Sequence, residues 1–258
     1  MNQKYIFANS LFAFVSAFAI TTILHESGHF ISYYLLGAHP ALHHNYVQVS
    51  DKNLSTLIVV ISALAGPVTS MVQAFVFGLF VTKKGGNDAK HLLFLWLSLL
   101  GAVNFFGYLM LTPFTNIGDT GRVAELLTLS DFIQLMIALF GIVFLILFVL
   151  KIGKYFANFI PQNSEKPLKG RYIRALLMYP IITGSLINAV LALPVVAALS
   201  LIYPVTSPYV NLTAYGKIRH TETNVNKTSP LESKFNGNLI LITALCVILN
   251  RILALGVS

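Results

Sequence analysis

Long apolar runs constrain this chain more than any other feature of its sequence. A helix needs about 20 apolar residues to cross the hydrocarbon core of a membrane, and a lipid-exposed backbone must satisfy its own hydrogen bonds. Six runs approach or exceed that length. They cover residues 5–36, 54–82, 91–111, 131–151, 174–203 and 238–257. The pattern predicts an all-α polytopic membrane protein with about six transmembrane helices.

The composition agrees with a membrane protein. Only 10% of the residues are charged and 56% are hydrophobic, whereas soluble domains contain about 25% charged residues. The net charge of +8 does not indicate a nucleic-acid partner, because the basic residues lie mostly between the apolar runs. The expected surroundings are the lipid bilayer. The single cysteine, Cys246, lies inside an apolar run and excludes a disulfide framework or a cysteine zinc site.

The distribution of Lys and Arg predicts an orientation. If spans alternate and the N-terminal side is called side A, ten basic residues fall on side A. Six fall on the opposite side B, counting a polar loop at about 204–238 there. The positive-inside rule then predicts a cytoplasmic N-terminus. We divide the chain into a core of three spans, residues 1–130, and three further spans, residues 131–258.

The segment His25-Glu26-Ser27-Gly28-His29 lies toward the side-B end of the first span. On a helix, His25 and His29 are one turn apart and project from the same face. Two imidazoles at this spacing can hold one zinc ion, and the Glu26 carboxylate between them can act as general base on a metal-bound water. An ionisable residue within a membrane span is a functional candidate by default. The plainer interpretation is a set of hydrogen bonds between helices.

A catalytic zinc site needs a third protein ligand. The acidic candidates on side B are Asp51, Asp119, Glu125 and Asp131. We favour Asp119, because it follows the helix-breaking Pro113 and is flanked by Gly118 and Gly121, which let the backbone turn close to a metal. Asp119 could instead cap a short helix over 122–129. Glu125 is the reserve ligand.

Two other classes of protein remain as alternatives. His39, His43 and His44, together with His25 and His29, suggest the histidine boxes of a membrane di-iron desaturase or hydroxylase. The chain has only seven histidines, and His91 and His220 are isolated, so we interpret His39, His43 and His44 as an interfacial loop. A non-catalytic scaffold or transporter is the third class, but it would not need a Glu between two His at this spacing.

Three elements together resemble the site-2 protease family of intramembrane zinc metalloproteases. They are the His25–His29 motif, the small-Gly-Pro element Ala65-Gly66-Pro67 in the second span, and Pro113 followed by Asp119 and Gly121. The resemblance covers about residues 5–125. Met110 stands where the family has Asn, so Asn104 or Asn116 is the expected replacement for holding the substrate backbone. Family members commonly have the site nearer the cytoplasm, whereas the charge count places it on side B.

The resemblance implies a zinc metalloendopeptidase that cleaves membrane-spanning or membrane-adjacent protein substrates. Its one zinc ion per chain would be held by His25, His29 and Asp119, with Glu26 as the catalytic base. A helical substrate must unwind, because its backbone groups are already paired. The short β-prone segment Tyr46–Val49 could pair with the unwound substrate as an edge strand, although an ordinary loop strand is the simpler interpretation.

Overall fold

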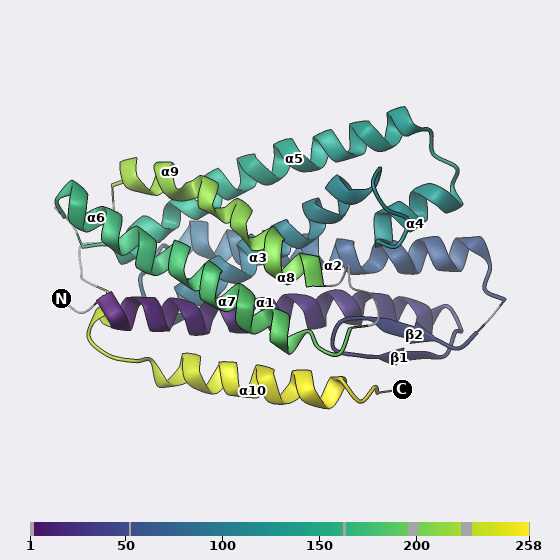
Figure 1. The fold of residues 1–258 in the computed structure, drawn as a ribbon, viewed down its shortest axis with the longest axis horizontal. Helices are drawn as coiled ribbons and strands as arrows, with labels where there is room; N and C mark the ends of the chain where they lie inside the picture. Colours follow the sequence, from purple (N-terminus) through teal and green to yellow (C-terminus); the bar gives the residue numbers. More distant parts are fainter. Residues whose placement is uncertain (1–2, 52, 162–163, 196–200, 223–228, 258) are drawn as a thin grey trace.

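Most helices of this chain run alongside one another in a single elongated bundle, seen in the computed structural model (Figure 1). The structure describes residues 3–51, 53–161, 164–195, 201–222 and 229–257. In these residues, five helical segments are long and apolar enough to cross a membrane. They are α1 (Gln3–Leu35), α2 (Thr56–Lys84), α3 (Ala89–Leu111), α5 (Asp131–Gly153) and a combined segment that contains α6 and α7.

The sixth predicted span corresponds to α10 (Gly237–Leu253). It has 17 residues, the lower limit for crossing the hydrocarbon core. It packs along α1 and runs from the N-terminal end of the bundle to the opposite end (Figure 1). The structure therefore agrees with an all-α membrane protein: five helical segments are long and apolar enough to span, and one apolar helix is shorter.

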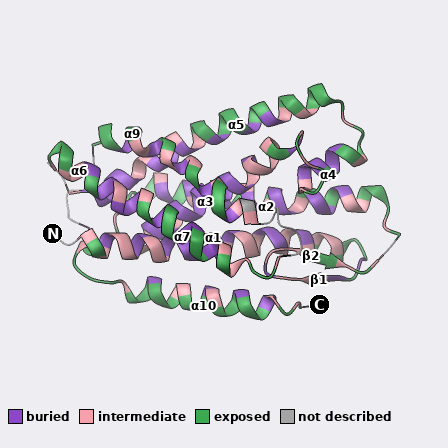
Figure 2. Ribbon diagram, in the orientation of Figure 1, coloured by how far each residue is buried: buried purple, intermediate pink, exposed green. Residues whose placement is uncertain are grey.

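Helices α1 and α3 form the centre of the bundle, and α2 and α5 have large exposed apolar faces (Figure 2). The centre is closely packed: Trp96 of α3 is fully buried against Phe14 of α1 and donates a hydrogen bond of 3.1 Å from Nε1 to Ser10 Oγ. The outer face of α5 exposes Phe132, Leu139 and Leu147. This is the pattern of helices whose outer surface meets lipid rather than water.

The fifth predicted span ends earlier than expected. It begins with α6 (Lys166–Ile173), continues through a π-helical turn (Arg174–Met178) and ends with α7 (Tyr179–Leu191), not at residue 203. After it, α8 (Ile202–Thr206), a 3-10 helix (Ser207–Thr213) and α9 (Ala214–His220) return toward the N-terminal end. They pack against α3, α5 and α6.

The predicted side-B position of the polar loop 204–238 is therefore wrong for residues 214–220 and 229–236. Asn9, near the start of α1, donates hydrogen bonds to the carbonyl oxygens of Leu231 (3.0 Å) and Lys234 (2.9 Å). The backbone N–H of Asn236 donates to Asn9 Oδ1 at 2.8 Å. Polar composition indicated a solvated loop, but the short helices within it bury Pro208, Ala214 and other residues in a groove of the bundle.

A β-hairpin lies at the end of the bundle opposite the N-terminus. Strands β1 (Pro40–Leu42) and β2 (Val47–Val49) pair antiparallel, so the expected β segment at 46–49 is confirmed as a strand. Leu42 also pairs with Val257 through two backbone hydrogen bonds of 2.7 and 2.9 Å. The short helix α4 (Asp119–Leu126) lies at the same end. Two further 3-10 helices cover Lys154–Phe159 and Pro230–Glu232.

Candidate metal centre

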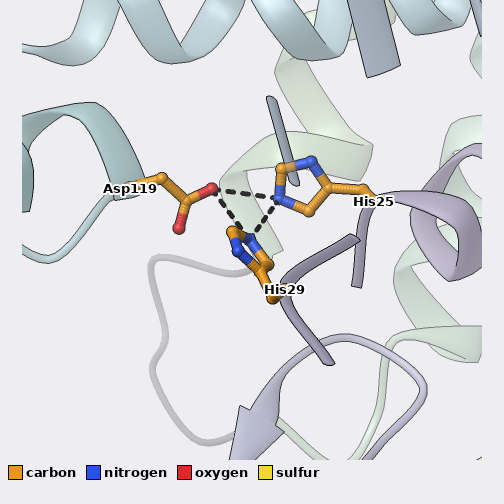
Figure 3. Close-up of side chains that lie close together, drawn as sticks. All are labelled: His25, His29 and Asp119. Carbon is orange, nitrogen blue, oxygen red and sulfur yellow. Dashed lines mark hydrogen bonds and ion pairs between the residues drawn. The ribbon is translucent and has the colours of Figure 1, made fainter. Parts of the chain in front are cut away.

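Three side chains from distant parts of the sequence converge between α1 and α4 (Figure 3). Asp119 Oδ2 lies 3.0 Å from His25 Nε2 and 3.2 Å from His29 Nε2. The two Nε2 atoms are 3.1 Å apart. In the described part of the chain, this is the one group of three His, Cys, Asp or Glu side chains arranged to hold a metal ion.

Hydrogen bonds at the far side of each ring fix which nitrogen faces the centre. His29 Nδ1 donates to the backbone carbonyl of Ser62 at 2.7 Å, because a carbonyl can only accept. Ser70 Oγ donates to Asn104 Oδ1 at 3.0 Å and so accepts from His25 Nδ1 at 3.2 Å. In neutral His25 and His29, both Nε2 atoms therefore carry lone pairs directed at Asp119. Such partners orient metal-binding histidines in known sites.

The distances fit a tetrahedral metal ion. Ligand atoms about 2.0–2.1 Å from a tetrahedral zinc are about 3.3 Å from one another, and the three distances here are 3.0–3.2 Å. Without a cation, two lone pairs and a carboxylate oxygen would face one another, and Asp119 Oδ2 is buried with no hydrogen-bond partner. A cation between them removes that conflict. The donor set suits zinc, but does not by itself distinguish zinc from other transition metals.

The close contact between α1 and α2 explains the glycine of Ala65-Gly66-Pro67. A Cβ atom on Gly66 would lie 2.3 Å from His29 Nε2, so any side chain there would displace the His29 ring. Gly28, inside the motif, is equally restricted, since its Cβ would lie 2.7 Å from the carbonyl oxygen of Ala65. Both glycines allow the second span to approach the two histidines.

Asp119 is the first residue of α4 rather than its cap. Gly118 occupies the N-cap position and makes no side-chain cap bond, so the capping interpretation of Asp119 is wrong and its carboxylate is directed at the histidines. Burial raises the pKa of this carboxyl group, but when His29 and His25 are protonated their charge and hydrogen bonds outweigh burial and hold its pKa well below the usual range. Asp119 is therefore available as an anionic ligand.

Two threonines hold α4 against the end of α3. Thr120 Oγ1 donates to the Tyr108 carbonyl at 2.6 Å, and Thr112 Oγ1 donates to Thr120 Oγ1 at 2.9 Å. Gly121 is required at the same contact, because a Cβ atom there would lie 1.7 Å from the Thr115 carbonyl oxygen. The turn after Pro113 is thus compact enough to bring Asp119 back to α1.

Glu26 faces the same region. It is 7% exposed, and its carboxylate interacts electrostatically with His25, His29 and Asp119. No hydrogen bond to it is found among the described residues. A buried carboxylate beside three candidate ligands and without a protein partner has the freedom that a general base requires.

The other acidic candidates are not brought to this centre. Glu125 is about half exposed and pairs with Arg122 at 2.7 Å. Asp131 is exposed at the start of α5, and Asp51 accepts hydrogen bonds from His39. The structure therefore does not bring the reserve ligand Glu125 to the two histidines.

The two asparagines proposed for substrate binding differ in position. Asn104 is buried next to the centre and is linked to His25 through Ser70. Asn116 is exposed and donates to Glu125 Oε1 at 3.3 Å. Only Asn104 is close enough to serve the centre.

The histidines after the motif lie elsewhere. His39 is exposed, and His43 stacks on Tyr46 with ring centroids 4.2 Å apart. His44 is buried rather than solvated, and its Nε2 donates to the Ala192 carbonyl at 2.9 Å. None of them joins His25 and His29, so the described residues do not assemble the histidine cluster of a di-iron enzyme.

Tyr108 is a site residue that the sequence did not reveal. Its ring stacks on His25, with centroids 5.0 Å apart and planes at 5°, and its hydroxyl interacts with Asp119. It lies four residues after Asn104, so both occupy one face of α3. The four-residue spacing could identify Tyr108 from the sequence only if the face of α3 that packs on α1 were already known.

No family model matches this chain, and no curated protein or solved structure matches it either. The resemblance to the site-2 protease family therefore depends on the three sequence elements and on the geometry described above.

Proposed function

We propose that this protein is an intramembrane zinc metalloprotease of the site-2 protease type. One observation carries the proposal: His25 Nε2, His29 Nε2 and Asp119 Oδ2 form a triangle with sides of 3.0–3.2 Å inside a membrane helix bundle, with the Glu26 carboxylate beside it. A structural zinc site would use four protein ligands, whereas three leave the position that catalysis needs.

The proposed roles follow from where each group lies. Zinc bound here would supply Lewis-acid chemistry, polarising a carbonyl and lowering the pKa of water to about 7. Glu26 accepts a proton from the attacking water and delivers it to the leaving amine. Ser62 and Ser70 keep the histidine rings oriented, and Asp119 supplies the negative charge.

The proposed substrate is a membrane-spanning or membrane-adjacent protein segment that has unwound. Strand β2 pairs with β1 on one edge, and among the described residues no strand pairs with its other edge. An unpaired strand edge is where an extended peptide adds in β-strand recognition. Asn104 adds a side-chain amide near the centre that can bind the substrate backbone.

The basic residues support a cytoplasmic N-terminus. With the chain after Leu191 returning to the N-terminal end, thirteen basic residues gather there: Lys4, Lys83, Lys84, Lys90, Lys151, Lys154, Lys166, Lys169, Arg171, Arg174, Lys217, Arg219 and Lys234. Among the described residues, Arg122 and Arg251 lie at the other end. Lys52 and Lys227, which the ten-to-six count placed on side B, lie outside the described residues. Among the remaining basic residues, this asymmetry favours side A as cytoplasmic. The proposed site then lies nearer the outer face.

The test is metal analysis combined with proteolysis, using protein purified in detergent. The wild type should contain about one zinc per chain, as expected for a site of this kind. His25→Ala and Asp119→Ala should lose it. Glu26→Gln should keep zinc and lose cleavage of a membrane-segment reporter, because it retains the shape of Glu26 but cannot accept the proton. Glu125→Gln, another glutamate at the same end of the bundle, is the matched control and should keep both.

Three results would contradict the proposal. Cleavage retained in Glu26→Gln removes Glu26 from the mechanism. Two irons per chain would restore the di-iron enzyme. Absence of bound metal after reconstitution with zinc would leave a scaffold or transporter.

A further inference from the structure

A cavity of about 430 Å³ lies directly behind Tyr108. It is lined by α3, α5, the connection from α3 to α4, and the segment from α8 into the following 3-10 helix. Its apolar wall includes Val103, Leu111, Leu145 and Val210. An apolar cavity of about 150 Å³ already accepts a benzene ring, so this one has room for the largest side chains.

The cavity shares a wall with the candidate metal centre. Tyr108 lines the cavity and stacks on His25. Gly118, which also lines it, directly precedes Asp119. A peptide segment held at the metal centre therefore has the cavity within reach of the side chains next to its scissile bond.

Gly107 keeps this cavity open. The other glycines of the five spanning segments each have a neighbour within 3.3 Å of a Cβ atom: Gly28, Gly66, Gly78, Gly101, Gly141, Gly153, Gly170 and Gly184. A Cβ atom on Gly107 would meet nothing within 4 Å. Glycine destabilises a helix interior relative to alanine, and close packing does not require it here. The space beside Gly107 is available to a ligand.

The cavity also has a polar end. Asn104 and Tyr203 both line it, and the buried Tyr203 hydroxyl interacts with the Asn104 side chain but makes no hydrogen bond of standard geometry. A buried hydroxyl without a well-formed hydrogen bond is unfavourable. An unwound substrate supplies backbone N–H and C=O groups that satisfy such a hydroxyl, while its side chain occupies the apolar part.

We propose that this cavity is a specificity pocket that receives one bulky apolar side chain, aromatic or long aliphatic, of the unwound substrate beside the scissile bond. This inference rests on the proposed protease function and adds to it the class of residue that the enzyme selects. Gly107 sets the depth of the pocket, and Asn104 and Tyr203 bind the backbone of the residue that enters it.

The experiment uses internally quenched apolar peptides with identical flanks and Ala, Leu or Phe at one central position. Zinc-loaded wild type in detergent should cleave the Phe peptide with a kcat/KM about 10-fold or more above that of the Ala peptide, the range typical of apolar pockets. Gly107→Leu should bring this ratio close to one, because its side chain occupies the cavity. Gly216→Leu is the matched control: Gly216 is also helical with nothing within 4 Å of its Cβ position, but lies on α9 outside the cavity, and should preserve the ratio.

A binding measurement separates this inference from the proposed function. Fluorescently labelled forms of the peptides are titrated into zinc-loaded Glu26→Gln and into Glu26→Gln combined with Gly107→Leu. If Glu26→Gln binds the Phe peptide more tightly and Gly107→Leu removes this preference, the pocket is supported. If the wild type nevertheless cleaves no peptide, the protease function is contradicted. Cleavage without a Phe preference, or a preference unchanged in Gly107→Leu, overturns the pocket and leaves the protease standing. Binding of no peptide overturns the pocket as well.

Zinc content and melting temperature report whether Gly107→Leu is folded. If it is not, Val210→Phe narrows the same cavity from its opposite wall and should lower the same ratio. An unchanged ratio in folded Val210→Phe would overturn the pocket.

Discussion

At the scale of single residues, the candidate centre depends on which atoms face inward. His25 and His29 present Nε2 to the centre because Ser70 and the Ser62 carbonyl occupy their Nδ1 atoms. The motif spacing predicted that both rings share a helix face. It could not predict the serines, since these belong to α2 and are brought to the rings by packing. The affinity for metal should therefore depend on residues that never touch it.

Ser70→Ala should weaken zinc binding about 10- to 100-fold, the usual effect of removing the partner of a metal-bound histidine. The physical reason is that the His25 ring loses its orienting hydrogen bond. Competition with a zinc chelator measures the affinity. Ser98→Ala is the control, because Ser98 Oγ makes a buried hydrogen bond between α3 and α2 but does not contact a ligand. Equal affinities in the two variants would contradict the assigned orientation of His25.

Gly66→Ala should abolish stoichiometric zinc binding. The added methyl group would lie 2.3 Å from His29 Nε2, so the ring must move out of the triangle. Zinc content of the purified variant is the readout. Gly216→Ala adds the same methyl group to another helix with open space around it and should bind zinc normally. Full zinc occupancy in Gly66→Ala would show that His29 is not a ligand in this position.

At the scale of elements, the decisive feature is how α4 is joined to α3. Pro113 ends the third span as the sequence indicated. The position of Asp119 then depends on the hydrogen bonds from Thr120 to Tyr108 and from Thr112 to Thr120. Through them the short α4 is fixed to a spanning helix instead of being a solvated turn. The position of Asp119, the proposed third ligand, therefore depends on these two hydrogen bonds between α4 and the end of α3.

Thr120→Val should destabilise the protein by about 1–3 kcal/mol, because two hydrogen bonds are lost. The Tyr108 carbonyl and the Thr112 hydroxyl then keep only the 3.3 Å bond between them. Zinc affinity should fall as well, since Asp119 is the adjacent residue. Thermal unfolding and chelator competition measure the two effects. Thr213→Val, which removes one local hydrogen bond to Val210, should change neither by a comparable amount. Normal zinc affinity in Thr120→Val would contradict the proposal that these hydrogen bonds position Asp119.

The β-hairpin should be anchored in a pH-dependent way by His44. Burial lowers the pKa of His44 and outweighs its bond to the Ala192 carbonyl, while nearby Arg251 and His43 lower the pKa further. The neutral form is therefore favoured in the folded state. Below about pH 6.5, the ordinary pKa of histidine, the unfolded state gains protons first and stability falls. Between about pH 7 and 8 no such loss is expected.

Thermal unfolding between pH 5 and 8 tests this. The wild type should lose stability as the pH falls through 6.5, and His44→Gln, which cannot be protonated, should lose less. His39→Gln is the control, because His39 is exposed. Identical pH profiles for wild type and His44→Gln would refute the anchoring by neutral His44.

At the scale of the whole molecule, the chain after α7 has the largest effect on topology. Strict alternation of spans assigned the segment around Ser233 to the same side as the loop before α5. In the structure, Asn9 holds residues 231–236 at the N-terminal end instead. The charge asymmetry of the bundle depends on this return, because Lys217, Arg219 and Lys234 move with it.

Cysteine labelling in cells distinguishes the two arrangements. In a Cys246→Ser background, Ser233→Cys and Ser130→Cys place single thiols at exposed positions. The structure predicts opposite sides: Ser130→Cys should react with a membrane-impermeant maleimide in intact cells, and Ser233→Cys only after permeabilisation. Labelling of both in intact cells would support the simple alternation of spans and contradict the return of the chain.

The sequence by itself determined the environment, the helical class and the identity of the ligand candidates. Those features depend on local quantities: the length of apolar runs, the one-turn spacing of His25 and His29, and the helix break at Pro113. Tertiary structure decided which carboxylate meets the histidines, that Asn104 rather than Asn116 lies near them, that Tyr108 stacks on His25, and where residues 202–236 run. These depend on contacts between helices far apart in the chain, and hydrophobic packing specifies them through shape rather than through any pattern along the sequence.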